Sequence, residues 1–144
     1  MNILVAVDMG PGYDKVLGFA AGLAEQAGGE VHVVHVITKQ EKEEREQTPG
    51  PSRYVDVMVE ETKRSLEESL TKLGVAESSI TAIARTGEPE GEIHKVAVEN
   101  DVDLLVIGMR RRSRVGKLLL GSHLQELLLT SDRPVVAVPI GPFD

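Results

Sequence analysis

Five short apolar runs recur along the chain, and segments with helical spacing separate them. The runs cover residues 3–7, 31–37, 80–84, 104–107 and 134–139. Several are continuous rather than alternating, as is typical of strands that are buried on both faces of a parallel sheet. Regular alternation of strands and helices favours parallel strands joined by right-handed crossovers. The sequence therefore predicts an α/β fold around a five-stranded parallel sheet.

The segments between the runs carry apolar residues at the spacing of amphipathic helices. Helices are predicted over residues 13–27, 55–73 and 118–129, and a further one starts at Pro89 and ends before Asn100. Gly28 and Gly74 follow two of them, where glycine commonly ends a helix. Residues 39–53 instead combine mixed charge with helix breakers, which indicates a flexible charged surface excursion. A chain of 144 residues is one domain of ordinary size, so we expect a single domain over 1–144.

Composition narrows the classes of function. Cysteine is absent, which excludes disulfide and thiolate chemistry and is typical of a reducing compartment. The N-terminal run is too short and too soon interrupted by Asp8 for a signal peptide or a membrane span, so a cytoplasmic protein is expected. A net charge of −7 disfavours nucleic-acid binding. Against this acidic background, a basic cluster stands in one segment: Arg110, Arg111, Arg112, Arg114 and Lys117.

Ligands of open parallel sheets bind beyond the carboxyl ends of the strands, where the strand order reverses. The loops after the first and fourth strands are therefore the candidate sites. Gly116-Lys117 does not form a phosphate-binding P-loop, because Arg111 and Leu118 occupy positions where that motif has Gly and Ser or Thr. The turn after the first strand lacks the third glycine of a dinucleotide fingerprint, where this chain has Lys15.

One spacing stands out: Gly108, two residues, position 111, nine residues, then Gly121-Ser122. Together with the opening segment 3–8, the segment 34–36, Gly87-Glu88-Pro89 and the closing segment 134–138, it resembles the universal stress protein family from end to end. The resemblance implies an open, doubly wound five-stranded parallel sheet with helices on both faces. This Rossmann-like fold, of the adenine nucleotide alpha hydrolase-like type, has strand order 3-2-1-4-5.

The resemblance also implies an adenine-nucleotide pocket for ATP, ADP or AMP, with Mg²⁺ accompanying the nucleotide. Its residues map onto Asp8, Val36, Gly108, Gly121 and Ser122. Asp8 would contact the ribose or Mg²⁺, and the backbone of Val36 would face the adenine edge. Gly121 and Ser122 would donate to phosphates, while Gly108 would let the chain turn away from the sheet. Each residue also has a purely structural alternative, as a turn cap, a packing contact or a helix cap.

Arg111 departs from the ATP-binding pattern, which has glycine there. A side chain at this position obstructs close approach of backbone to phosphate, yet guanidinium groups also bind phosphate well. Two interpretations therefore stand. Either Arg111 joins a nucleotide site, or it blocks the pocket of a nucleotide-free interaction protein whose arginine-rich loop docks an acidic protein partner.

No catalytic residue or metal site is predicted. The sequence holds no nucleophile elbow, and its histidines, at positions 32, 35, 94 and 123, lack metal-protease spacing. Each histidine is interpreted as structural, and the hypothesis is a regulatory protein rather than an enzyme, with slow ATP hydrolysis left open. A homodimer is expected through residues 135–138, because an apolar edge strand invites pairing and the family resemblance indicates the same strand.

Overall fold

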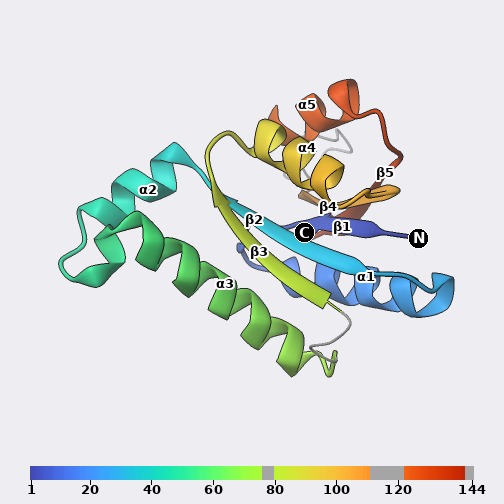
Figure 1. The fold of residues 1–144 in the computed structure, drawn as a ribbon, viewed down its shortest axis with the longest axis horizontal. Coiled ribbons are helices and arrows are strands. Elements are labelled where there is room, and N and C mark those ends of the chain that lie inside the picture. Colours follow the sequence, from blue (N-terminus) through green and yellow to red (C-terminus); the bar gives the residue numbers. More distant parts are fainter. Residues whose placement is uncertain (76–79, 111–121, 142–144) are drawn as a thin grey trace.

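The five predicted strands form one parallel sheet, and helices cover both of its faces (Figure 1). The computed structural model describes residues 1–75, 80–110 and 122–141. The strand order is β3-β2-β1-β4-β5, so the predicted fold class and order are confirmed. In chain order the described elements are β1 (Ile3–Ala6), α1 (Tyr13–Ala27), β2 (Val31–Ile37), α2 (Lys39–Glu46), the 3₁₀ helix η1 (Pro51–Arg53), α3 (Val55–Lys72), β3 (Ile80–Thr86), α4 (Pro89–Glu99), β4 (Leu104–Arg110), α5 (Ser122–Thr130) and β5 (Val135–Ile140).

Two apolar layers sandwich the sheet, because successive residues of a strand point to opposite faces. On one face, Val16 and Leu17 of α1 and Leu66 of α3 pack against Val5 and neighbouring strand residues. On the other face, α4 and α5 contribute a second cluster that includes Ile93, Val96, Leu124 and Leu127. Strands β1 and β2 are almost fully buried between these layers, as their continuous apolar runs predict. None of the helices within the described residues is long and apolar enough to cross a membrane.

Residues 39–53 have more regular structure than the predicted excursion. Thr38 caps α2, because its hydroxyl accepts the backbone N–H of Glu41 at 3.2 Å. Lys42 and Glu46 then lie one turn apart on the same helix. No residue of α2 is buried, which is why the segment lacks the apolar spacing from which a helix can be predicted. Its surface position agrees with the prediction, but its first half is helical.

Strand β4 is longer than predicted and changes the interpretation of the segment that follows it. The apolar run ends at Ile107, yet the strand continues through Arg110 and pairs with β5 as far as Ile140. Strand β5 includes Pro139, which an edge strand tolerates because one side of it needs no hydrogen-bond donors. The backbone of Gly108, Met109 and Arg110 therefore belongs to the sheet rather than to a basic loop.

Candidate functional site

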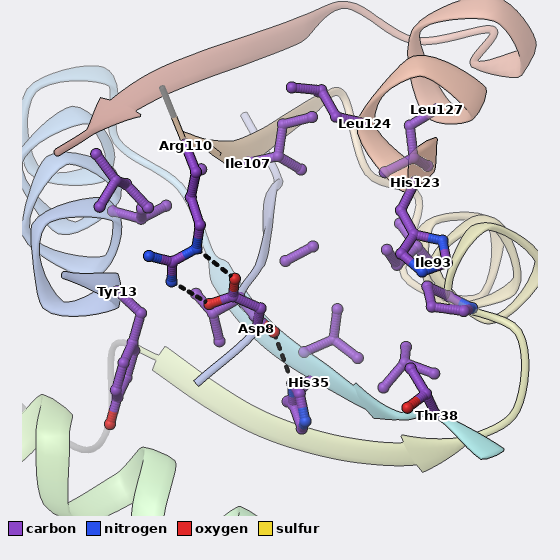
Figure 2. A pocket seen from close by; sticks show the side chains of 18 of the residues that line it. Asp8, Tyr13, His35, Thr38, Ile93, Ile107, Arg110, His123, Leu124 and Leu127 are labelled. Carbon is purple, nitrogen blue, oxygen red and sulfur yellow. Dashed lines mark hydrogen bonds and ion pairs between the residues drawn. The ribbon is translucent and has the colours of Figure 1, made fainter. Parts of the chain in front are cut away.

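A pocket of about 240 Å³ lies beyond the carboxyl ends of β1, β2 and β4 (Figure 2). The first and fourth strands are neighbours in the sheet but lead to helices on opposite faces, so their loops diverge there. One wall is apolar and comes from β2, β4, α4 and α5, with Val34, Val36, Ile93, Ile107, Leu124 and Leu127. The polar lining residues include Asp8, Tyr13, His35, Thr38, Glu41, Arg110 and His123.

Asp8 and Arg110 form a bidentate ion pair at this pocket. Arg110 Nε donates to Asp8 Oδ2 at 2.8 Å, and Arg110 Nη2 donates to Asp8 Oδ1 at 2.7 Å. The two residues stand 102 positions apart, but Arg110 ends β4 and Asp8 follows the carboxyl end of the adjacent strand β1. A third donor, Nη1, binds the carbonyl oxygen of Pro11 at 2.7 Å. The guanidinium thus joins β4 to the loop after β1.

The charge of Asp8 is stabilised from several directions. Partial burial raises the pKa of this carboxyl, but the hydrogen bonds from Arg110 and Gly10 and the positive charges of Arg110 and His35 outweigh it. The net effect is a pKa below the ordinary value, so Asp8 is ionised at neutral pH. The hydrogen bond that Arg110 donates to Asp8 in turn raises the pKa of Arg110. The pair is a fixed arrangement of opposite charges at the pocket wall.

His35 forms a second polar contact of the pocket. Its Nδ1 lies 2.7 Å from the carbonyl oxygen of Val7, and its Nε2 lies 3.0 Å from Glu41 Oε2. Both partners are acceptors, so both ring nitrogens must carry protons for the two bonds to form. Burial lowers the pKa of His35, but the hydrogen bonds to Glu41 and Val7 and the nearby carboxylates raise it above its ordinary value. The imidazolium therefore holds α2 beside the sheet.

Backbone groups of Val36 face the pocket. The N–H of Val7 donates to the carbonyl of Val34, so the backbone of Val34 faces the β1 side of β2. The N–H of Gly87 donates to the carbonyl of Ile37, so Ile37 faces the opposite, β3 side. Because successive residues alternate, Val36 also faces the β1 side, beyond the end of β1. Among the described residues, no backbone hydrogen bond links Val36 to Val7 or to Asp8.

The rim of the pocket includes a contact between two helices. His123 Nδ1 of α5 lies 2.5 Å from Glu90 Oε1 of α4. Slight burial raises the pKa of Glu90, but the hydrogen bond to His123, a hydrogen bond to its own backbone and the charge of His123 together hold it below its ordinary value. This contact fixes the start of α5 against α4, beside the apolar wall.

The structure brings together Asp8, Val36 and Gly108 of the predicted site residues, since all three line the pocket. Arg111 and Gly121 lie outside the described residues, as does the rest of the predicted arginine-rich loop. Ser122 is the first residue of α5, and only its backbone is described.

The predicted role of Gly108 is wrong. It does not turn the chain away from the sheet, because it lies within β4 and pairs with Val138 of β5. Its lack of a side chain has another reason: a Cβ atom there would lie 2.4 Å from Ile140 Cδ1 and 3.1 Å from Val16 Cγ2. Because Gly108 has no side chain, Ile140 of β5 and Val16 of α1 can pack directly against the backbone of β4.

Sequence reasoning did not select Arg110, His35, Glu41 or Tyr13 as site residues, although all line the pocket. From the sequence, Arg110 is one of the arginines of the basic cluster whose guanidinium groups could bind phosphate, and His35 is interpreted as structural. One signal could have found Arg110: with β1 and β4 adjacent, its place after the fourth apolar run puts it opposite Asp8. No comparable signal marks Glu41, which reaches His35 only because α2 forms.

Comparison with known proteins decides the family. The model of the universal stress protein family matches residues 1–139. The chain belongs to the universal stress protein family. A universal stress protein of Mycolicibacterium smegmatis is 63% identical over 38 residues, a stretch that covers 26% of this chain and 29% of that protein. The universal stress protein YxiE of Bacillus subtilis is 28% identical over 144 residues, which covers 95% of this chain and 97% of YxiE.

Solved universal stress protein structures share the fold. A universal stress protein from Archaeoglobus fulgidus, solved in complex with dAMP, superposes with a TM-score of 0.62 and 26% sequence identity. The match covers 96% of this chain and 97% of that one. The expected adenine nucleotide alpha hydrolase-like fold is thereby confirmed.

Proposed function

We propose that this universal stress protein binds an adenine nucleotide in the pocket at the carboxyl ends of β1, β2 and β4. The observation that carries the proposal is a single pocket wall that combines apolar side chains with the outward-facing backbone of Val36. Nucleotide bases need this combination, because their faces are apolar and their edges carry donors and acceptors. The relative from Archaeoglobus fulgidus that was solved with dAMP supports the choice of adenine.

Each part of the ligand has a proposed position. The base lies against Ile93, Ile107 and Leu124, with its edge toward the backbone of Val36. A ribose hydroxyl donates to Asp8, whose ionised carboxylate accepts only. The phosphates extend toward the backbone of Ser122 at the N-terminal end of α5, where helix N–H groups favour anions. A pocket of about 240 Å³ lies just below the range of about 300–1,000 Å³ for ligand pockets, which suits a nucleoside with its phosphates outside.

Mg²⁺ would reach the site with the nucleotide. The described residues contain no group of three or more His, Cys, Asp or Glu side chains arranged to hold a metal. Mg²⁺ commonly binds through one or two carboxylates and the substrate phosphates while it keeps several waters. Asp8 is the pocket carboxylate with the matching chemistry, so ATP with Mg²⁺ is the proposed ligand, and ADP and AMP are the alternatives.

Titration calorimetry tests this function directly. The protein is titrated with ATP and Mg²⁺, ADP, AMP and, as a mismatched base, GTP. We expect micromolar or tighter binding of an adenine nucleotide and weaker binding of GTP. Mass spectrometry of small molecules released on denaturation should detect any nucleotide retained through purification. No heat with millimolar adenine nucleotides would refute the proposal.

A pair of matched variants assigns the binding to this pocket. Asp8→Asn keeps the size of the side chain but removes the charge that accepts a ribose hydroxyl, so we expect about tenfold weaker binding, as for loss of a hydrogen bond to a charged group. Asp14→Asn makes the same chemical change on the first turn of α1, at an exposed residue that does not line the pocket. It should bind as the wild type does. Equal affinity of all three proteins would place the nucleotide elsewhere.

A further inference from the structure

We propose that Arg110 determines how the pocket distinguishes ribose from deoxyribose, because it competes with the sugar for Asp8. This inference rests on the proposed nucleotide function. Figure 2 shows the guanidinium of Arg110 against the carboxylate of Asp8 inside the pocket. This ion pair joins β4 to the loop after β1, and we call it the clasp, which is closed while Arg110 is bonded to Asp8. A ligand that needs the full carboxylate must open it.

The hydrogen-bonding capacity of Asp8 explains the competition. An ionised carboxylate offers about four acceptor sites. Three are already used: Oδ1 accepts from Gly10 N–H at 2.9 Å and from Arg110 Nη2, and Oδ2 accepts from Arg110 Nε. Roughly one site therefore remains. A sugar with a single free hydroxyl on this face can use it, whereas the two vicinal hydroxyls of ribose require Arg110 to leave.

The loop after β1 is shaped around the guanidinium. Gly10 lies directly against it, since a Cβ atom on Gly10 would be 2.6 Å from Arg110 Nη2 and 3.2 Å from Asp8 Oδ1. Pro11 turns its carbonyl oxygen to Nη1 at 2.7 Å. Met9 adopts a left-handed φ of 62°, which is uncommon for a residue with a side chain. Several features of one loop thus favour the closed clasp.

The ion pair is exposed enough to open. The side chain of Asp8 is 59% exposed and that of Arg110 is 28% exposed, so solvent screens their attraction. The closed clasp therefore limits access of the sugar to Asp8, but the ion pair can still open. While Arg110 holds Asp8, AMP gains little over 2′-deoxy-AMP from its additional hydroxyl. Once Arg110 is removed, both hydroxyls of the ribose can reach the carboxylate.

The experiment measures the ratio of the dissociation constants of 2′-deoxy-AMP and AMP by calorimetry. Both ligands carry the same base and phosphate, so the ratio isolates the sugar. In the wild type we expect a ratio of roughly 1–3, as for a clasp that is mostly closed. In Arg110→Met the ratio should rise to about tenfold or more, which corresponds to about 1.4 kcal/mol.

A second variant opens the clasp without removing the arginine. Gly10→Ala introduces the Cβ that collides with Nη2, and the φ of Gly10 lies outside the left-handed region, so alanine is compatible with its backbone. Its ratio should also exceed that of the wild type. If Arg110→Met does not fold, this variant carries the test.

Arg133→Met is the matched control. Arg133 also binds one carboxylate, Asp132 at 2.7 Å, and one carbonyl, Val102 at 2.7 Å, but it precedes β5 at the opposite end of the strands. It should keep the wild-type ratio. The inference is wrong if AMP binds and the ratio is the same in the wild type, Arg110→Met and Gly10→Ala. If AMP and 2′-deoxy-AMP do not bind, the ratio is measured with ATP and 2′-deoxy-ATP in the presence of Mg²⁺. If no adenine nucleotide binds any of these proteins, the nucleotide function itself is refuted, and the role of Arg110 with it.

Discussion

The contact between His35 and Glu41 should make the stability of the protein depend on pH, and Glu41→Gln is the perturbation that reveals it. The side chain of His35 is 4% exposed and that of Glu41 is 35% exposed. Hydrogen bonds to charged groups contribute about 1.5–3 kcal/mol, whereas exposed ion pairs contribute about 0.2–1 kcal/mol. His35 is buried, but Glu41 is partly screened by solvent, so the contact should lie between these two ranges. We expect Glu41→Gln to lower the free energy of unfolding by about 1–2 kcal/mol at pH 6.

The sign of the pH dependence follows from the raised pKa of His35. Below the unfolded-state pKa of about 6.5, the histidine is protonated in both the folded and the unfolded protein, so the contact contributes fully. As the pH rises through the folded-state pKa, the imidazolium loses the proton that it shares with Glu41. The difference in unfolding free energy between wild type and Glu41→Gln should therefore shrink from pH 6 to pH 9, toward the constant contribution of the Glu41 charge to the helix dipole.

Urea denaturation at constant ionic strength, repeated across this pH range, measures that difference. Glu41 also stands in the first turn of α2, where its charge favours the helix dipole, but that contribution does not change between pH 6 and 9. Glu43→Gln, at an exposed position of the same helix, should change stability by less than about 0.5 kcal/mol at every pH. An unfolding difference that stays equal at pH 6 and pH 9 would refute the doubly protonated His35.

Three further predictions concern the strands and the segment after β4. Gly108→Ala should lower the free energy of unfolding by about 1–3 kcal/mol in a denaturant titration, because its Cβ would overlap Ile140; an unchanged midpoint would show that this side chain yields freely. Arg111→Gly should raise the affinity for ATP if the arginine obstructs the phosphates, and lower it if the guanidinium binds them, as calorimetry can measure. Strand β5 is an edge of the sheet, so light scattering should find a dimer paired through residues 135–138, and a monomer at micromolar concentration would contradict it.

Much of the fold could be predicted because strands and helices leave local patterns. The bounds of α1 and β2 agree with their predicted ranges, since burial on both faces of a strand and on one face of a helix dictates where apolar residues stand. Helix α2 left no such pattern, because none of its residues is buried. The end of β4 was also missed, since a polar arginine continues the strand beyond its apolar run and is held there by pairing with Ile140.

The candidate site could be predicted only where one element carries the signal by itself. Asp8 follows a strand, and parallel strands place such residues at the ligand-binding edge, so its position was predictable. The strand order places Arg110 near Asp8, but the contact itself could not be predicted, because the guanidinium could have faced solvent. The contact of His35 could not be predicted either, because its partner Glu41 lies on α2, a helix that has no apolar pattern in the sequence.

Two of the ion pairs at the pocket have a common physical origin. In each, a charged residue just beyond the carboxyl end of β1, or beside that end on β2, meets an opposite charge from another element: Asp8 meets Arg110, and His35 meets Glu41. Strand ends are where backbone pairing stops and solvent begins, so a charge there can be stabilised by one partner without full desolvation. For the same reason the partners can be exchanged for a ligand at modest free-energy cost. Under the proposed function, the exposed pair of Asp8 with Arg110 is therefore the one that we expect a ligand to open, whereas the buried His35 would keep α2 in place.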